Sequence, residues 1–397
     1  MQEGTPARAE PLLSEQMTEI EVVVRRIASH GLRRRDEPKM TSEVPDELWS
    51  DVLRMVAKQR ITGLASAAER EEALLLTEPQ RNELLDRHRS AMAMVLLLED
   101  LLRKVSSAMV SADVPIVVLK GPAVAHAFYP HPSWRSYGDL DLLIGGADWQ
   151  RACTVLAELG FRRLIPEPRP GFDERFGKGA SFENDQALQV DLHRTLALGP
   201  FGLWIDADAL VESTTRFQMN GMSLRRLDDT HAFIHACIHA ALGRQNPLVM
   251  PLRDVLQIAW SGRVDWPVLS ARIVEWRLIA PVGHAMRTSA SILSVPLPDA
   301  ANEVAQMPIR AIDRRALAAY TTDRHRRGGP SLAALWAIRG IGSKVAYVRA
   351  MLFPDQPFRE ARGSAARRSR WMVAIRWAGQ RIRRTAHGKR KPGENKR

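Results

Sequence analysis

The sequence predicts an α+β fold: a small mixed β-sheet core flanked by N-terminal and C-terminal helical regions. Two patterns carry this prediction. Apolar residues recur three and four apart at both ends of the chain, whereas short β-branched and alternating runs are confined to the middle. At 397 residues the chain is long enough for about two or three hydrophobic cores.

The first hundred residues predict a helical region. Residues 1–17 are polar and are expected to be disordered. From 18 to 105 the apolar spacing is helical, with breaks near Pro38, Pro45 and Pro79. The clearest helical stretch is 81–105, where the leucines and valines fall mostly on one side.

The hydrophobic pattern changes from helical spacing to short β-branched runs in the segment that follows. Residues 116–119 form a short β-branched run that ends at the Lys-Gly-Pro turn 120–122, and 123–129 then has helical character. After a proline-rich loop, 139–144 again has the character of a strand, and 147–159 is an amphipathic helix. The order strand, turn, helix, strand, helix predicts the start of an α/β core.

The core continues with three more strand signals. Residues 161–165 and 188–193 have strand patterns, and 216–227 predicts a hairpin centred on an Asn-Gly pair. Helical spacing then returns from 228 to 352. We therefore expect an α/β core over 106–227 and a helical C-terminal region after it.

The positive charge is concentrated at the C-terminus. The chain has 57 Lys+Arg and 45 Asp+Glu, and residues 361–397 contain 13 of the bases and one of the acids, which leaves 44 of each in the first 360. A neutral body does not predict a nucleic-acid-binding core. The basic tail, 353–397, predicts at most a weak, salt-dependent anionic partner such as nucleic acid or a membrane surface.

The tail also predicts an amphipathic helix, because Trp371, Ile375, Ala378 and Ile382 recur at helical spacing among arginines. One interpretation places this helix on anionic lipid or nucleic acid. The other docks its apolar side on the body and leaves 389–397 solvated, which is the usual fate of such charge runs.

Composition also limits the compartment. Cys153 and Cys237 are too few for a disulfide framework, which favours a reducing environment. The N-terminus lacks an apolar signal region, and the longest apolar run, 91–98, is too short to span a bilayer. We expect a cytoplasmic protein with no transmembrane segment.

The strongest chemical signal is an Asp-x-Asp pair. In a strand, Asp139 and Asp141 share one face, roughly 6 to 7 Å apart along the backbone, while Leu140 and Leu142 point to the other face. Two such carboxylates repel each other, and a divalent cation removes that repulsion while supplying the charge that phosphoryl transfer needs.

Further residues extend this pair to a candidate site. Asp191 lies on a later strand and completes a three-carboxylate cluster if the two strands are neighbours, and His193 shares its face. Lys120 and Gly121 form a strand-to-helix turn suited to an anion. Arg135 has a guanidinium fork that can bind a phosphate.

Each of these signals also has a structural interpretation. An isolated Asp-x-Asp pair is common on surface strands, Lys120 and Gly121 suit an ordinary turn, and Arg135 suits an ion pair. The helix carrying His231, His235 and His239 has the spacing for metal ligands, but its histidines fit packing better. Taken together, these residues predict a functional site more strongly than any one of them does alone.

The run LKGPAVAHAFYPHPSWRSYGDLDLLI resembles the signature of a bacterial nucleotidyltransferase-like family, the uncharacterised nucleotidyltransferases. VDLHR at 190–194 and HACIHAALGR with a following Leu-Arg-Asp extend the resemblance over about 18–384. It implies a DNA-polymerase-β-like nucleotidyltransferase fold using two divalent ions, Mg²⁺ or Mn²⁺. It also implies that Asp139, Asp141 and Asp191 are the catalytic metal ligands.

One feature departs from the wider superfamily, which has Gly-Gly or Gly-Ser where this chain has Lys120 and Gly121. The turn therefore has no serine hydroxyl, and Pro122 has no N–H to donate to a phosphate. The resemblance implies nucleotide binding by Lys120, Gly121, Arg135 and His193, but by a different phosphate contact.

The leading functional hypothesis is a metal-dependent nucleotidyltransferase that transfers NMP from an NTP to a hydroxyl-bearing metabolite, sugar, protein or RNA. One alternative is a catalytically silent nucleotide- or partner-binding module of the same fold. Another is a nucleotidyltransferase toxin acting on RNA. A manganese-dependent glycosyltransferase is a weaker alternative, because the residues before the Asp-x-Asp pair do not predict a dinucleotide-type domain.

Overall fold

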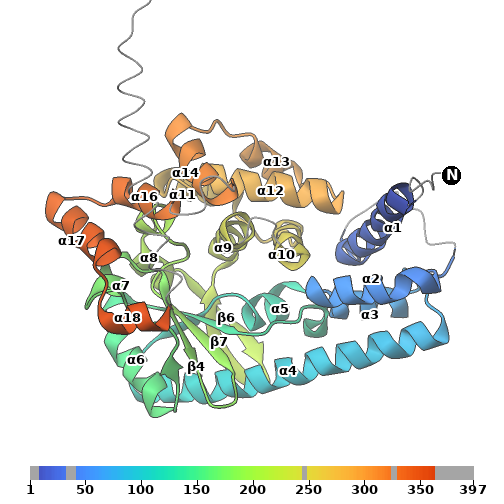
Figure 1. Cartoon of the computed structure of the whole chain (residues 1–397), viewed down its shortest axis with the longest axis horizontal. Coiled ribbons are helices and arrows are strands. Elements are labelled where there is room, and N and C mark those ends of the chain that lie inside the picture. The colour runs from blue at the N-terminus through green and yellow to red at the C-terminus, as the bar shows by residue number, and fades with distance from the viewer. Residues whose placement is uncertain (1–8, 33–41, 244–247, 323–328, 363–397) are drawn as a thin grey trace, which may run out of the picture.

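The computed structural model describes residues 9–32, 42–243, 248–322 and 329–362. A mixed sheet lies at the centre, with helices on both faces, so the predicted α+β class is confirmed (Figure 1). Its seven strands, in spatial order β3-β4-β5-β2-β1-β7-β6, are β1 (Ile116–Val118), β2 (Leu140–Ile144), β3 (Arg162–Arg163), β4 (Gly179–Glu183), β5 (Gln189–His193), β6 (Thr214–Met219) and β7 (Met222–Leu227).

The pairing of the central strands places the acidic residues. β2 runs antiparallel to β1 and parallel to β5, and Asp141 is paired in register with Asp191. The chain crosses from β2 to β5 through two helices and the strands β3 and β4, which is the long connection that a parallel pair requires. The adjacency on which the three-carboxylate hypothesis depended is therefore present.

Strand β4 was missed by the sequence analysis. Its residues, Gly-Ala-Ser-Phe-Glu, include none that is β-branched, and four of the five are half-buried. The strand is held by antiparallel pairing with β5 over its whole length. Its place in the sheet is thus decided by neighbours rather than by local propensity.

The helices form three groups along the chain. The N-terminal group is α1 (Ala9–Ser29), α2 (Asp46–Lys58), α3 (Thr62–Arg70) and α4 (Glu78–Ser111). The core contributes α5 (Pro122–Phe128), α6 (Trp149–Glu158), α7 (Phe172–Phe176) and α8 (Ala207–Glu212), with short 3-10 turns η1 (Pro132–Trp134), η2 (Gly146–Asp148) and η3 (Phe201–Leu203). The C-terminal group is α9 (Asp229–Leu242), α10 (Val249–Ala259), α11 (Trp266–Glu275), α12 (Ile279–Leu293), α13 (Asp299–Ala305), α14 (Ala311–Thr321), α16 (Gly329–Ala337), α17 (Ile341–Leu352) and α18 (Gln356–Ala361).

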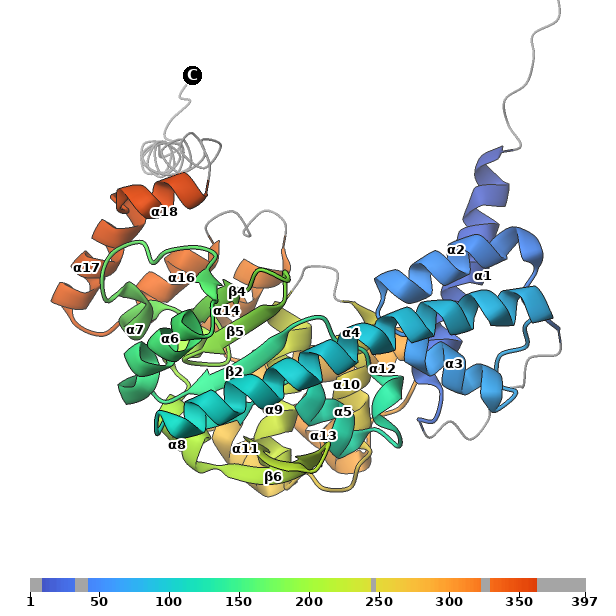
Figure 2. The same cartoon turned by 90° about the horizontal axis from the view of Figure 1, so that it is seen from below.

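Helix α4 connects the N-terminal helices to the sheet (Figure 2). It begins with a capping box, in which Thr77 accepts from the backbone of Gln80 and the Gln80 side chain accepts from the backbone of Thr77. Pro79 lies in the first turn, where a proline is tolerated, so the break predicted there is the helix start. The helix runs 34 residues and extends past both ends of the predicted stretch.

The two faces of the sheet are buried in different hydrophobic clusters. Leu140, Leu142 and Ile144 pack on the cluster that contains α4 and α6, whereas Leu143 packs on the cluster that contains α9 and α10. Because side chains alternate along a strand, Asp141 faces the α9 side together with Leu143. The apolar residues next to the acids thus pack on the opposite face, as predicted.

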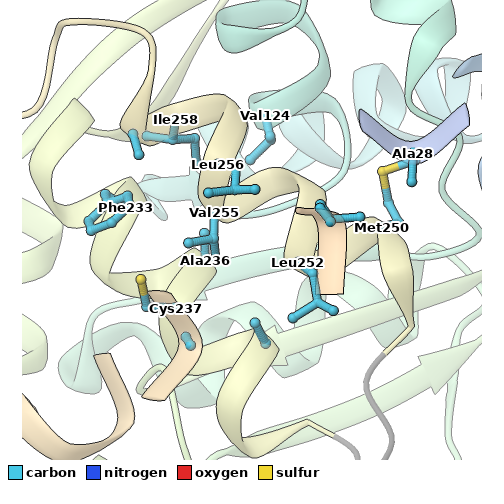
Figure 3. Packing of buried hydrophobic residues seen from close by; sticks show 14 of the residues in the cluster. Ala28, Val124, Phe233, Ala236, Cys237, Met250, Leu252, Val255, Leu256 and Ile258 are labelled. Atoms are coloured by element: carbon cyan, nitrogen blue, oxygen red, sulfur yellow. The ribbon is translucent and has the colours of Figure 1, made fainter. Parts of the chain in front are cut away.

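Helices α9 and α10 pack over the face of the sheet to which Asp141 points. Figure 3 shows Phe233, Ala236 and Cys237 of α9 beside Leu252 and Val255 of α10, all of them buried. Every one of these side chains belongs to the larger cluster. Helices α9 and α10 are therefore part of the closely packed core beside the candidate site.

The larger cluster crosses the predicted region boundaries at 105 and 228. It runs from Ile20 in α1 to Tyr320 in α14. The fully buried Arg253 of α10 also donates to the carbonyls of Ala28 (3.0 Å) and His30 (2.6 Å) at the end of α1. The two helical regions thus share one core, and their division into units stays a prediction.

The ends of the chain differ from the prediction in one respect. Helix α1 begins at Ala9, within the stretch expected to be disordered, and the proline of its first turn is compatible with a helix start. Residues 1–8 and the amphipathic helix predicted around Trp371 lie outside the described residues. In the described part of the chain, no helix combines the length and apolar character needed to cross a bilayer.

Candidate active site

The site is built on the register of two parallel strands. Neighbouring strands lie about 4.8 Å apart, so paired residues on one face have adjacent side chains. Ligand atoms of Asp141, Asp191 and His193 all lie within 4.8 Å of one another. The structure therefore brings together two of the three predicted metal ligands, with His193 as the third member of this group.

Asp141 is the centre of the cluster and is 3% exposed. Its Oδ1 lies 2.7 Å from Nζ of Lys120 and 2.8 Å from Nε2 of His193. Burial alone would raise the pKa of this carboxyl, but Lys120 and His193 outweigh it and hold the pKa well below its ordinary value. Asp141 is therefore ionised at neutral pH.

Lys120 is positioned by the end of β1. The backbone N–H of Leu119 donates to the carbonyl of Asp141 at 2.9 Å, which aligns the turn with β2. Gly121 follows with φ +46°, a conformation that a side chain would strain. Burial would lower the pKa of Lys120, but the charges of Asp141 and Asp139 raise it, so the ammonium stays charged.

Asp139 lies just before β2 and is half-buried. It lines a cavity of about 180 Å³ together with Arg60, Lys120 and Gly121. Burial and the charge of Asp141 raise the pKa of its carboxyl, against the opposing charges of Lys120 and Arg60. The charge of Asp141 thus affects the pKa of Asp139, but Asp139 is not a member of the group formed by Asp141, Asp191 and His193.

Two basic residues of the site were missed by the sequence analysis. Lys178 precedes β4, and its carbonyl accepts from the backbone N–H of Arg194 at 2.8 Å just after β5. Burial and the charge of Lys120 lower the pKa of Lys178. Arg60 comes from the turn between α2 and α3, where nothing in its local sequence indicates a role.

The three histidines of α9 do not act as one set. His231 is not part of a candidate metal-binding group among the described residues, and its Nδ1 lies 2.8 Å from Oδ2 of Asp228 at the helix start. His239 lines the cavity beside the acids. Burial and the charge of Lys120 hold the pKa values of His235 and His239 well below the ordinary range, so both imidazoles are neutral.

Arg135 lies at the edge of the same cavity, but its fork is engaged elsewhere. Nε and one terminal nitrogen donate to the two oxygens of Asp254 at 2.9 and 2.7 Å, and the other terminal nitrogen donates to the carbonyl of Gly121 at 3.2 Å. The phosphate contact expected of this fork is thus replaced by a buried ion pair. Asp254 is itself buried.

The donor set fits a divalent cation. Two carboxylates and an imidazole converge, and Lys120 already contributes one positive charge to Asp141, which shows that the cluster attracts cations. Oxygen ligands favour Mg²⁺, and an added imidazole is compatible with Mn²⁺ as well. His193 Nδ1 is buried and has no hydrogen-bond partner among the described residues.

Comparison with known proteins gives a family for this geometry. The model of the uncharacterised nucleotidyltransferase family matches residues 45–294. No curated protein matches the chain. One solved structure, an antigenic nucleotidyltransferase-like protein from Paracoccidioides brasiliensis, is similar at 13% identity with a TM-score of 0.30, over 52% of this chain and 95% of that one.

Proposed function

The chain belongs to the uncharacterised nucleotidyltransferase family, and from this premise we propose that it transfers NMP from an NTP to a hydroxyl-bearing acceptor. The observation that carries the proposal is the register of Asp141 with Asp191, together with the cavity that Asp141 lines beside Asp139 and Lys120. Three carboxylates, one buried and two half-buried, have no packing reason to gather at neighbouring strands, and cation-assisted phosphoryl transfer is a chemical reason.

We assign the triphosphate to the basic side of this cavity. Lys120 and Arg60 line it, and Lys178 adds a third cation near the same acids. Gly121 brings backbone close to the ligand without a side chain in the way, which offsets the missing N–H of Pro122. Lys120 takes the role of a point charge on a phosphate.

Asp141, Asp191 and His193 would hold a divalent cation, with Asp139 as a further carboxylate at its edge. Bound there, Mg²⁺ or Mn²⁺ would neutralise phosphate charge and polarise the phosphorus that is attacked. With a cation present, Lys120 is free to move from Asp141 to a phosphate oxygen, since its four-carbon stem is flexible.

The transfer itself balances in one displacement. The acceptor hydroxyl oxygen attacks the α-phosphorus, the bond between the α-phosphorus and the bridging oxygen to the β-phosphorus breaks, and pyrophosphate leaves. The hydroxyl proton passes to Asp191, which stands at the half-buried edge of the cluster. The neutral His235 and His239 then exclude water from the α9 side without adding charge.

The experiment is transfer of label from each α-labelled NTP to cell-lysate fractions, with Mg²⁺ or Mn²⁺. Wild type is compared with Asp139→Asn plus Asp141→Asn, and with Asp185→Asn as the matched control. Asp185 is a carboxylate whose side chain is 90% exposed, on the turn between β4 and β5. A γ-labelled NTP serves as the control for simple phosphoryl transfer.

Label from the α position alone, lost only in the double variant, supports nucleotidyl transfer, and the labelled product gives the acceptor. Equal labelling by wild type and the double variant, both folded by circular dichroism, overturns the proposal. So does label that comes from the γ position.

A further inference from the structure

A second and much larger cavity shares no lining residue with the cavity at the acidic cluster. Its volume is about 1080 Å³, which is the size of a site for a substantial small molecule. Its walls come from α7, η3, the start of α8, the end of α11, α14, α16 and α17. In Figure 1, α7, α8, α16 and α17 gather at one end of the sheet.

The charge around this cavity differs from that of the neutral body. Four arginines line it, against two acids, for a local balance of +2. They are Arg175, Arg277, Arg315 and Arg339, and the acids are Asp206 and Glu275.

Both acids are already engaged by groups of the protein. Asp206 caps α8 by accepting from the backbone of residues 208 and 209. Glu275 lies 2.7 Å from the guanidinium of Arg272. Both keep the negative charge that the balance of +2 counts, but among the described residues neither forms an ion pair with an arginine of the cavity.

The arginines keep unused hydrogen-bonding capacity. Among the residues that the structure describes, no acidic side chain pairs with Arg315 or Arg339, and Arg175 has only the hydroxyl of Ser343, at 3.2 Å. Arg277 donates to Asp313, but its buried Nε has no hydrogen-bond partner in the described part of the chain. Arg315 and Arg339 are exposed at the cavity, and an anion would replace water at their donors with charge-assisted hydrogen bonds.

Aromatic and apolar groups complete the wall. Trp336 of α16 is 79% exposed at the cavity, an unusual position for so large an apolar side chain. Trp204 lies under the guanidinium of Arg277, at 4.0 Å, and Phe176 lies under that of Arg175, at 4.9 Å. Flat rings and guanidinium planes together favour a ligand with an aromatic ring.

A short segment of chain connects the cavity to the acidic cluster. Phe176 lines the cavity, and two residues later Lys178 interacts with Asp141 and Asp191. Two residues of extended chain span at most about 7 Å. The Phe176 wall of the large cavity is thus close along the chain to Lys178, on the β4 side of the cluster, while the triphosphate is assigned to the cavity at Lys120.

We propose that this cavity binds the acceptor, a small molecule that carries an aromatic ring and an anionic group. The ring stacks on Trp336, and the anion binds Arg315, Arg339 and the open donors of Arg277. The role as acceptor rests on the proposed nucleotidyl transfer, whereas the ligand class rests only on the cavity. The two parts can therefore be tested separately.

The binding test uses 1-naphthyl phosphate on the full chain without divalent cations or NTP, by isothermal titration calorimetry. We expect it to bind at least tenfold more tightly than either inorganic phosphate or 1-naphthol, because only the whole molecule uses both halves of the wall. Trp336→Ala should weaken binding about fivefold, and Arg315→Gln plus Arg339→Gln about tenfold.

Two controls locate the binding. Arg89→Gln plus Arg103→Gln removes the same charge from the exposed side of α4, where both arginines form exposed ion pairs, and should leave binding unchanged. Asp139→Asn should also leave it unchanged, because the acidic cluster is not the binding site. Circular dichroism confirms that each variant is folded.

Equal binding by wild type and the Trp336 and Arg315/Arg339 variants overturns the ligand class, as does 1-naphthyl phosphate binding no better than phosphate. The acceptor role is read in the label-transfer assay, where 1-naphthyl phosphate should inhibit competitively against the lysate acceptor. Binding without inhibition of an active enzyme overturns the acceptor role. Absence of any transfer instead overturns the proposed function and leaves the binding result standing.

Discussion

Two buried acidic clusters lie on the α9 and α10 side of the molecule, and they are built in opposite ways. In the closed cluster, around Asp254, the carboxylate has its partners within the protein. Arg135 binds both carboxylate oxygens, and the hydroxyl of Tyr129 donates to Oδ1 at 2.8 Å. The open cluster, around Asp141, has three carboxylates that are not paired one to one with the neighbouring basic groups. A cavity reaches Asp139 and Asp141. A buried carboxylate by itself is thus no sign of chemistry.

The difference lies in what remains unsatisfied. Burial and Asp254 raise the pKa of Tyr129 well above its ordinary value, so that cluster stays a fixed ion pair with a neutral phenol. Asp139 instead has a raised carboxyl pKa because burial and Asp141 oppose its ionisation. A carboxyl group at a cavity whose ionisation is opposed in this way is a group that a bound cation would stabilise.

The largest expected effect is at the open cluster. Asp141→Asn should lower the rate of nucleotidyl transfer by about a factor of 10³, since it removes the most buried member of the metal group. Label transfer per folded protein measures this. Asp185→Asn is the control, and a loss of less than tenfold at Asp141 would show that this cluster is not where the chemistry occurs.

The closed cluster should respond in stability. Arg135→Met leaves Asp254 buried without its partner and should lower the free energy of unfolding by about 3 kcal/mol. Urea denaturation measures it. Arg135→Met combined with Asp254→Leu should recover more than half of that loss, because no buried charge is then unpaired. An equally unstable double variant would contradict the assignment of this cluster as a self-contained ion pair.

A third cluster, on the opposite face of the sheet, gives a pH-dependent test. His126 and Tyr137 contact Oε1 of the buried Glu99 at 2.8 and 2.9 Å, and Asn220 donates to Oε2 at 2.8 Å. Burial would raise the pKa of Glu99, but these hydrogen bonds outweigh it and lower the pKa. The ionised carboxylate is therefore the form that stabilises the fold.

The expected result follows from the sign of that shift. Because the folded pKa lies below the unfolded one, the stabilisation is present above about pH 4.3 and is lost as pH falls through the folded pKa. Glu99→Gln should lower the free energy of unfolding by about 1 to 2 kcal/mol at pH 7. Urea denaturation from pH 7 to pH 3 should show the gap to wild type narrowing, and a constant gap would refute the electrostatic origin.

The smallest effect is expected at an exposed pair. Arg89 lies 3.1 Å from Asp86 on α4, and both side chains are about three-quarters exposed (74% and 76%). Arg89→Met should change the free energy of unfolding by less than about 0.5 kcal/mol. A change as large as that of Arg135→Met would show that burial does not explain the contrast between the clusters.

The sequence determined the fold class and most of the strands, because periodicity and turn chemistry are local. The hairpin about Asn220 and Gly221 and the strand-turn-helix at Lys120 follow from residues that favour those conformations themselves. The Asp-x-Asp pair was likewise visible, since a strand puts alternate residues on one face. β4 was not, because its pairing with β5 rather than its composition makes it a strand.

Only the tertiary structure decided which charges belong together. The register of β2 with β5 placed Asp191 beside Asp141, and it brought Lys178 and the α9 histidines to the same side. The packing of α10 likewise pairs the guanidinium of Arg135 with Asp254, 119 residues away along the chain. Local sequence determines the conformation and the chemical groups of each segment. Contacts between distant segments determine the charges around each group, and these decide its partners and its role.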